Sequence, residues 1–382
     1  MGLVLDSEQT LLRSTATEFA RARLPVSGLR RLRDTADATG FDRAAWREMA
    51  DLGWAGMLVP EELGGNGYGH YGLGLVLQAL GRTLAASPLQ STVVLAGSTL
   101  QLAGGHPAAQ EWLPRIAAGD AVVALAFEES ATHAPYRCTT RAERTTGGWN
   151  LHGCKRFVLD GHVADWLLVL ARTDGAVDDA SGLSLFLLDP AASGVTRRRL
   201  SMVDSRNSAD LELAGVSVPG DALLGQAGGA TEILDRVLDR ARILLAAEML
   251  GMAEEAFEIT LGYLKQRTQF GVPIGSFQAL KHRAVQMFIE IELSRSVVFE
   301  ALTALDDAGR VMDVPRLASV CKARLNDTLQ LISNECVQMH GGIGVTDEFD
   351  IGLYLKRARV AQAQLGSSAF HRDRYATLSG FY

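Results

Sequence analysis

Apolar positions follow a helical period over the first third of the chain. Between residues 7 and 119 they recur every three or four positions, which predicts helices that pack through one face. We expect helices over residues 7–24, with Ser7 near its cap, over 41–52 and over 71–84. The last of these is almost uncharged, so it should be buried. The pattern predicts an N-terminal helical domain, residues 1–119.

The period changes to two in the middle of the chain, residues 120–225. Apolar strand-like runs cover residues 122–127, 149–152, 166–171, 183–188 and 210–213. Gly-Gly, Asp-Gly and Asp-Pro pairs separate them, as turns separate short strands. This spacing predicts an antiparallel β-barrel or sandwich. The dense basic run Arg197-Arg-Arg199 is interpreted as a solvated strand edge.

Long helical patterns return in the last part of the chain, residues 226–382. The segments 232–265, 277–305 and 314–339 are each long enough to be helices of a bundle. We therefore expect an α+β multidomain fold: an N-terminal helical domain, a middle antiparallel β-barrel or sandwich, and a C-terminal four-helix bundle.

The break between two of these helices, residues 263–282, carries candidate ligand-binding side chains. A Gly-Val-Pro sequence stops the first helix, and Ser276 can cap the second. Arg267, Phe270 and Gln278 stand beside the break. A guanidinium, an aromatic ring and a carboxamide suit a ligand with a phosphate and a purine. The alternative is that the arginine caps a helix, the phenylalanine is core and the glutamine is solvated.

Composition argues against several classes of protein. The net charge is −7 and the Lys and Arg residues are scattered, which gives no basic field for nucleic acid. The four cysteines show neither zinc-site nor disulfide-framework spacing, so we expect no metal. No stretch approaches a membrane span and no signal segment opens the chain, so we expect a cytoplasmic protein.

A dinucleotide-type glycine pattern occurs at Gly67-Tyr-Gly-His-Tyr-Gly72. The true fingerprint follows a strand and precedes an acidic residue about twenty positions on. No Asp or Glu lies between Leu63 and Gln110. We therefore interpret the pattern as a glycine-rich loop.

Two motifs resemble the acyl-CoA dehydrogenase family. The first is Arg-x-x-Phe-Gly-x-x-Ile-x-x-Phe-Gln, from Arg267 to Gln278, and the second is Gln338-Met-His-Gly-Gly-Ile-Gly344. The family's three-domain order extends the resemblance over essentially the whole chain. It implies an FAD-dependent enzyme that desaturates the Cα–Cβ bond of an acyl-CoA thioester. Electrons would pass to an electron-transfer flavoprotein.

The resemblance also assigns residues to ligands. The positions expected at FAD are Arg267, Phe270 and Gln278, from across a subunit boundary, with Gln338, Gly341, Gly342, Phe157, Phe127, Ser130 and Ser367. Arg242 is expected near the thioester and His133 near CoA. His340 would orient the pyrophosphate loop, while His282 and His371 are expected at a surface or an interface.

The reaction needs a base for the α proton, a hydride acceptor and donors to the thioester oxygen. A flavin supplies the hydride acceptor. The family's base is a Glu in one of two places, and this chain has Leu365 and Ala241 there. Glu248, seven residues beyond Ala241 on the same helix, is the remaining candidate base. The alternative is that Glu248 forms a salt bridge, for instance to Arg242 or to a neighbouring helix.

Three hypotheses follow. The first is a self-sufficient FAD-dependent acyl-CoA dehydrogenase, of a bacterial branch that often acts on bulky, ring-bearing or steroid side-chain thioesters. The second is a partner subunit of an α2β2 heterotetramer that helps to bind FAD and has a vestigial site of its own. The third is flavin oxidase or hydratase-like chemistry on the same scaffold. A homotetramer would suit the first hypothesis.

Overall fold

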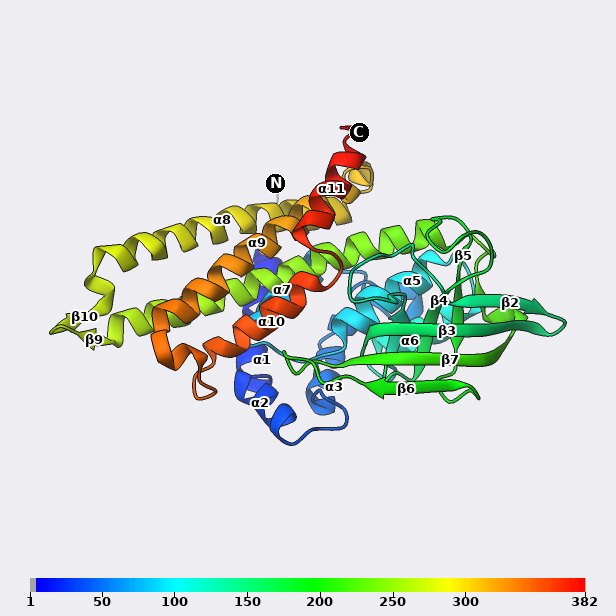
Figure 1. Cartoon of the computed structure of the whole chain (residues 1–382), viewed down its shortest axis with the longest axis horizontal. Coiled ribbons are helices and arrows are strands. Elements are labelled where there is room, and N and C mark those ends of the chain that lie inside the picture. Colours follow the sequence, from blue (N-terminus) through cyan, green and yellow to red (C-terminus); the bar gives the residue numbers. More distant parts are fainter. Residues whose placement is uncertain (1–4, 382) are drawn as a thin grey trace. The chain divides into compact units, whose positions relative to one another are not determined.

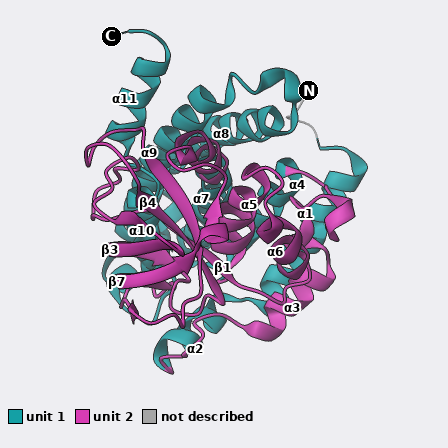
Figure 2. Cartoon of the chain, turned by 90° about the vertical axis from the view of Figure 1, so that its right-hand side faces the viewer, with its two compact units in different colours: residues 1–34, 70–85, 242–382 teal, residues 35–69, 86–241 magenta. Residues whose placement is uncertain are grey.

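The structure is a computed structural model that describes residues 5–381 (Figure 1). It divides into two compact units (Figure 2). Unit 1 comprises Met1–Asp34, His70–Ala85 and Arg242–Tyr382, and unit 2 comprises Thr35–Gly69 and Ala86–Ala241. Each unit therefore combines segments that are distant in sequence.

Unit 1 is helical. Its helices are α1 (Ser7–Arg23), α2 (Val26–Asp34), α4 (His70–Arg82), most of α7 (Ala230–Gln266), α8 (Gln278–Asp306), α9 (Val314–His340), α10 (Ile351–Ala363) and α11 (Ser368–Leu378), with the short turns η5 (Ile274–Ser276), η6 (Ala308–Arg310) and η7 (Gly341–Val345). The three predicted long helices are confirmed as α7, α8 and α9. Asp6 caps α1, because its side chain accepts from the amide of Gln9.

Glycines allow α4 and α7 to pack closely within unit 1. A Cβ added to Gly81 would lie 2.1 Å from the carbonyl oxygen of Glu248, and one added to Gly251 would lie 1.9 Å from that of Gln78. Neither position can hold a side chain unless the helices move apart. The backbone on both sides of Glu248 is therefore fixed against α4.

Unit 2 combines short helices with a sheet. Its helical elements are α3 (Arg43–Asp51), η1 (Trp54–Gly56), η2 (Glu61–Leu63), the π-helix η3 (Leu89–Gly97), α5 (Ser98–Leu102), α6 (Pro107–Ala117) and η4 (Gly220–Ala222). Its strands are β1 (Val123–Ala126), β2 (Arg141–Thr145), β3 (Gly148–Leu159), β4 (Trp166–Arg172), β5 (Leu183–Leu188), β6 (Val195–Arg199), β7 (Ser208–Pro219) and β8 (Leu223–Leu224). The glycine-rich loop that ends at α4 follows no strand, as expected.

The predicted middle β domain is confirmed, although its sheet is open, not a closed barrel, and mixed, because β4 pairs in parallel with β1 and β2. Its order is β6-β7-β3-β2-β4-β5-β8, and β1 pairs with β4 in parallel. β6 is an edge strand that carries the Arg197-Arg-Arg199 run, as expected, but only Arg198 is exposed. Arg197 donates to the carbonyls of Gly161 and Ala164, and Arg199 donates to Asp37 and Asn207. Charged side chains on an edge disfavour further pairing, which gives a physical reason why the sheet does not close there.

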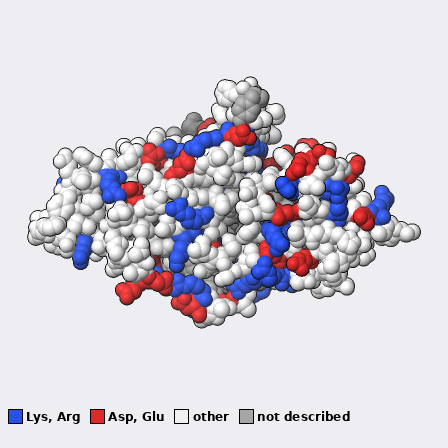
Figure 3. All heavy atoms as spheres, in the orientation of Figure 1, with Lys and Arg blue, Asp and Glu red and all other residues white. Residues whose placement is uncertain are grey.

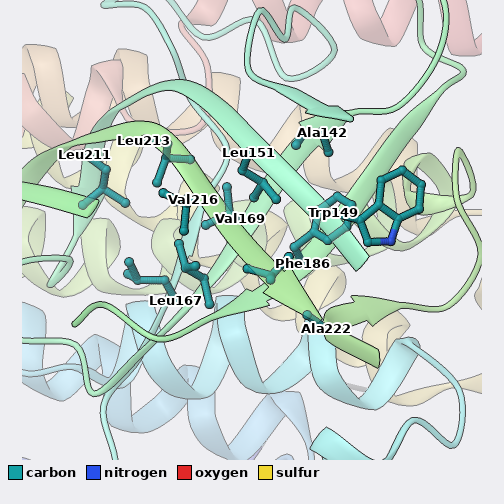
Figure 4. Close-up of a cluster of buried hydrophobic side chains, with 14 of the residues drawn as sticks. Ala142, Trp149, Leu151, Leu167, Val169, Phe186, Leu211, Leu213, Val216 and Ala222 are labelled. Atoms are coloured by element: carbon teal, nitrogen blue, oxygen red, sulfur yellow. The ribbon is translucent and has the colours of Figure 1, made fainter. Parts of the chain in front are cut away.

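One apolar cluster fills the β part of unit 2 (Figure 4). Its members come from alternate positions of β3, β4, β5 and β7, so the period of two in the sequence corresponds to one face of the sheet. Trp149 packs edge-on against Phe186, with ring centroids 5.4 Å apart. This core supports the loops that follow β1 and β3.

Two details differ from the sequence-based expectations. Ser276 does not cap α8: its hydroxyl donates to the carbonyl of Pro273, and the N-cap residue Phe277 makes no side-chain cap. His371 is buried, not at a surface.

Among residues 5–381, no helix has the length and apolar character needed to cross a membrane. Basic and acidic side chains are interspersed on the face shown in Figure 3.

Candidate functional site

The break between α7 and α8 forms a small exposed hairpin. Strands β9 (Thr268–Gln269) and β10 (Val272–Pro273) pair, and Phe270 occupies the turn with φ +54°. Its ring is 92% exposed and lies edge-on to Phe277, with centroids 6.2 Å apart. The alternative in which Phe270 is core is therefore wrong. A non-glycine residue in this backbone region stores strain, which is common at ligand sites.

The other two predicted side chains of this segment are exposed as well. Arg267 and Gln278 lie at the two ends of the hairpin segment. Among residues 5–381, Arg267 makes no side-chain hydrogen bond or salt bridge, so it does not cap α7. The end of the bundle that carries the hairpin shows few charged atoms in Figure 3. All three side chains are thus exposed; the ring contacts Phe277, and within residues 5–381 the guanidinium and the carboxamide make no side-chain hydrogen bond.

The second predicted segment lies at the end of α9. Gln338 is exposed, and Gly341 has φ +63°. A Cβ added to Gly341 or Gly342 would meet no atom within 4 Å. The backbone at both glycines is therefore open to close approach by a ligand, which suits a pyrophosphate-binding turn.

His340 adds an unpaired polar atom beside these glycines. Its Nδ1 lies 2.7 Å from the carbonyl oxygen of Cys336, and its ring stacks on Tyr263 at 4.4 Å. Burial lowers the pKa of His340, so the ring is neutral, and Nδ1 donates to the carbonyl. Among the described residues, the buried Nε2 has no partner. This segment thus offers a fixed acceptor, and it fits a hydroxyl-bearing cofactor such as FAD.

Phe157 is turned outward by a bulge in β3. The pairing of β3 with β7 shifts between Lys155 and Val158, and Phe157 in between has φ +53° and is 41% exposed. A bulge re-aims a side chain in this way. Phe127 is buried, with its ring edge-on to His133. Of these two rings expected at FAD, Phe157 is therefore exposed on strained backbone and Phe127 is buried.

A buried ion pair fixes the segment after β1 to β3. Lys155 Nζ donates to Glu129 at 2.6 Å, and Glu129 also accepts from Thr139 and Thr140. Burial alone would raise the pKa of Glu129, but Lys155 and the threonines outweigh it and lower that pKa to about 2. The carboxylate is thus a structural anchor and stays ionised.

Ser130 and His133 are held close to this anchor. The Ser130 hydroxyl donates to the carbonyl of Thr132 at 2.6 Å. His133 Nδ1 contacts a carboxylate oxygen of Glu128. Both side chains therefore have partners within unit 2, and their predicted FAD and CoA contacts remain predictions.

Leu365 occupies a pinned loop at one of the two base positions. It is 4% exposed and has φ +59°. Its carbonyl accepts from Arg242 Nε at 3.3 Å and lies 2.9 Å from His371 Nε2. The Ser367 hydroxyl next to it caps α11 by accepting from the amide of Phe370. The loop geometry is therefore held firmly, but the side chain it presents has no acid–base chemistry.

Lys322 also holds the loop that carries Leu365. Its ammonium donates to Asn326 at 2.6 Å and to the carbonyls of Ala361 and Gly366 at 3.0 and 3.2 Å. Burial lowers the pKa of Lys322 well below its usual value. The guanidinium of Arg242 lies over the Phe370 ring, 5.5 Å from its centroid. Two basic side chains thus hold the backbone of the loop that carries Leu365.

Ala241, at the second base position, is fully buried. Its carbonyl accepts from Gln90 Nε2 at 3.1 Å. Gln90 lies on the π-helix η3, a rare form that is often found at functional sites. No carboxylate therefore stands at this position either.

Glu248 is paired with a neighbouring helix. Arg357 of α10 donates to its Oε1 from Nη2 at 3.0 Å and from Nε at 3.2 Å, and both side chains are 6% exposed. This is the salt bridge to a neighbouring helix that the sequence left open. To act as a base, Glu248 would have to leave Arg357.

Sequence reasoning missed three residues at these sites: Gln90, Lys322 and Arg357. Gln90 had a usable signal, because it is a polar side chain in an apolar run. The two cations had none, since basic residues on helices are usually solvated. Their contacts form only in the folded chain: Lys322 binds carbonyls 39 to 44 positions away, and Arg357 pairs with Glu248 109 positions away.

Comparison with known proteins identifies the family that shares this architecture. Family profiles described as the acyl-CoA dehydrogenase N-terminal, middle and C-terminal domains match residues 6–120, 127–216 and 228–378. Acyl-CoA dehydrogenase IpdE2 of Mycobacterium tuberculosis is 32% identical over 359 residues, which cover 94% of this chain and 92% of that protein.

Two solved structures are similar over nearly their whole length. A variant of the Tcur3481-Tcur3483 steroid acyl-CoA dehydrogenase aligns with a TM-score of 0.86 and 30% identity, covering 98% of each chain. A chain of the ChsE4-ChsE5 complex from Mycobacterium tuberculosis aligns with a TM-score of 0.87 and 27% identity, covering 100% of each chain.

A helical, β and helical architecture that matches three acyl-CoA dehydrogenase domain profiles places the chain among the flavoprotein oxidoreductases. The chain belongs to the acyl-CoA dehydrogenase family, whose members use FAD to oxidise a CH–CH bond of acyl-CoA thioesters. The resemblance inferred from the two sequence motifs is thereby confirmed.

Proposed function

We propose that this chain is a subunit of a heteromeric acyl-CoA dehydrogenase, in which an unlike family member supplies the catalytic base. The observation that carries the proposal is the state of the carboxylate positions. Buried Leu365 and Ala241 fill the two base positions, and the remaining acid, Glu248, is tied to Arg357. A general base must reach the proton that it abstracts. Leu365 and Ala241 have no basic group, and the carboxylate of Glu248 is held by Arg357.

The chain's contribution to the cofactor is its exposed hairpin. Arg267, Phe270 and Gln278 hold the adenine side of an FAD bound in the neighbouring subunit, and Gln338 with Gly341 contacts the pyrophosphate. The exposed ring of Phe270 on its strained backbone and the open backbone at Gly341 support this assignment. When bound, FAD supplies the hydride acceptor.

The substrate is a bulky, ring-bearing acyl-CoA thioester, and the electrons pass to an electron-transfer flavoprotein. Support for the substrate comes from a similar solved protein, Tcur3481-Tcur3483, which is named a steroid acyl-CoA dehydrogenase. Support for a heteromer comes from the similar ChsE4-ChsE5 complex, which contains unlike chains.

A self-sufficient dehydrogenase with Glu248 as base is the second candidate. Glu248 lies seven residues along α7 from Ala241, so the two positions share a face about 10 Å apart. Glu248 lies within a buried apolar run, and burial disfavours an ionised carboxylate. The group could therefore take up a proton once Arg357 moved away.

The test is co-expression with unlike family members from the same organism that carry Glu at a usual base position. We expect one of them to form a complex with this chain that binds FAD and oxidises acyl-CoA. Changing that Glu to Gln in the partner subunit should abolish turnover, whereas Glu248→Gln in this chain should leave turnover per folded complex intact. The reverse pattern would establish the second candidate instead.

A further inference from the structure

The π-helix η3 carries a buried acceptor that no described residue, 5–381, satisfies. Gln90 is 8% exposed, and within residues 5–381 its Oε1 has no hydrogen-bond partner. Buried polar atoms in folded proteins are nearly always paired, because an unpaired one loses its bonds to water without replacement. This oxygen is therefore an acceptor that a donor group of a ligand, or a water molecule, can fill.

The orientation of the Gln90 carboxamide is fixed. Nε2 donates to the carbonyl of Ala241 at 3.1 Å. A flipped amide would place two acceptors, Oε1 and the Ala241 oxygen, against each other, so the flip is excluded. Oε1 is thus held as an acceptor, and only a donor group can satisfy it.

The neighbouring polar side chains of η3 show that the segment is otherwise satisfied. Ser91 donates to Asp160 at 2.5 Å and Thr92 to the carbonyl of Val123 at 3.1 Å. The hydroxyl of Ser98, just beyond η3, also has no partner among the described residues. A hydroxyl rotates freely, however, so its direction carries less information than that of the fixed amide.

We infer that Gln90 is a specificity-determining residue for an acyl group that bears a hydroxyl, which donates to Oε1. This inference rests on the proposed acyl-CoA function, in which Ala241 stands at a base position and lacks the volume of a Glu side chain. A hydroxyl on the acyl moiety supplies the required donor. A keto oxygen is itself an acceptor and would repel Oε1, and a purely hydrocarbon acyl group would leave Oε1 unpaired.

Binding of CoA thioethers tests the inference without any turnover, since no base can act on them. The probes are S-(cyclohexylmethyl)-CoA, its 3- and 4-hydroxy derivatives and its 4-oxo derivative. They are titrated calorimetrically into the purified protein in the assembly in which it is expressed. We expect at least one hydroxy isomer to bind tenfold or more tightly than the parent, with no gain for the oxo derivative.

The variants separate Gln90 from general effects. Gln90→Met keeps the length of the side chain and should remove the hydroxyl preference, while the parent binds equally well or better. Gln101→Met is the matched control, because Gln101 is a partly buried glutamine that also donates to a backbone carbonyl, that of Leu58. It should keep the preference, and thermal unfolding verifies that both variants fold.

Three results would overturn the inference: no hydroxy isomer is preferred, Gln90→Met weakens all probes equally, or no probe binds. Equal affinities throughout would mean that a bound water satisfies Oε1. Because the probes are inert, these results are independent of which subunit supplies the base. A self-sufficient enzyme could still show the hydroxyl preference, and a heteromer could lack it.

Discussion

Arg357 and Glu248 form a buried ion pair between α10 and α7, with Nη2 to Oε1 at 3.0 Å. The two residues are 109 positions apart, and both side chains are 6% exposed. A pair in this environment gives little net stability, but removing one member leaves the other charge buried and unpaired. The strength of this ion pair determines whether Glu248 is held as a structural group or can act as a base.

Glu248→Gln should lower the free energy of unfolding by about 3 kcal/mol, because it removes the charge that the buried Arg357 guanidinium pairs with at 3.0 Å. Arg357→Met should cost a similar amount. The double variant should lose much less than the sum, which urea denaturation of the four proteins would measure as a coupling energy. Additive losses would show that the two side chains do not interact.

Leu365→Glu should introduce base activity. The loop is already pinned by Arg242 and Lys322, so the new carboxylate would occupy a fixed position with cations nearby. In an assembly whose partner subunit carries Gln in place of its own base Glu, we expect acyl-CoA-dependent flavin bleaching to rise by about 10²-fold or more, as general-base catalysis provides. Leu365→Gln is the control, since it has the same shape without a proton acceptor of comparable strength. Equal rates for both variants would show that this loop does not face the α proton.

Phe270→Gly should separate cofactor binding from stability. Glycine tolerates φ +54°, so the chain should unfold at an equal or higher denaturant concentration, with a gain of up to about 1 kcal/mol. The assembly should nevertheless retain less FAD, measured by absorbance after gel filtration. Met312→Ala, which removes another exposed apolar side chain, should leave the FAD content unchanged. Full FAD retention in the glycine variant would argue against a ligand role for the ring.

His162 should make stability depend on pH. Burial and, to a smaller extent, Arg199 lower its pKa to about 4. Below the ordinary value of about 6.5, the unfolded chain takes up a proton that the folded chain does not. The contribution is therefore fully present above pH 6.5 and is lost as the pH falls toward 4. Because the ring is only half-buried, we expect a loss of about 1–2 kcal/mol.

The matched measurement is urea denaturation of the wild type and His162→Asn at pH 7.0 and 4.5. The variant should lose less stability than the wild type over this interval, by the amount attributed to the imidazole. Identical losses would show that His162 titrates normally in the folded protein.

The long helices and most strands could be predicted because their signal is local. The breaks at Pro25 and Gly271 and the period of three or four bound α1 and α7 directly. Sheet closure could not be predicted, since alternation shows which face is buried but not whether edge strands meet. The parallel pairing of β1 with β4 joins residues 43 positions apart, such as Val123 with Trp166.

The candidate site was predictable where a motif kept its residues and unpredictable where it did not. Arg267, Phe270 and Gln278 could be proposed from the sequence because they stand in one motif, and all three are exposed; their ligand contacts stay a prediction. The fate of Glu248 depended on which residue faced it, and Arg357 could be identified only in the folded chain. Gln90 became significant only when its amide was seen to be half-satisfied.

The most direct test of the central claim is the visible spectrum and FAD-to-chain ratio of this chain purified alone, followed by anaerobic addition of acyl-CoA thioesters. We predict that the isolated chain holds substoichiometric flavin and that no thioester bleaches it, whereas the complex with an unlike family member is both yellow and bleached. Stoichiometric flavin that bleaches in the isolated chain would contradict the account and make this chain a dehydrogenase in its own right.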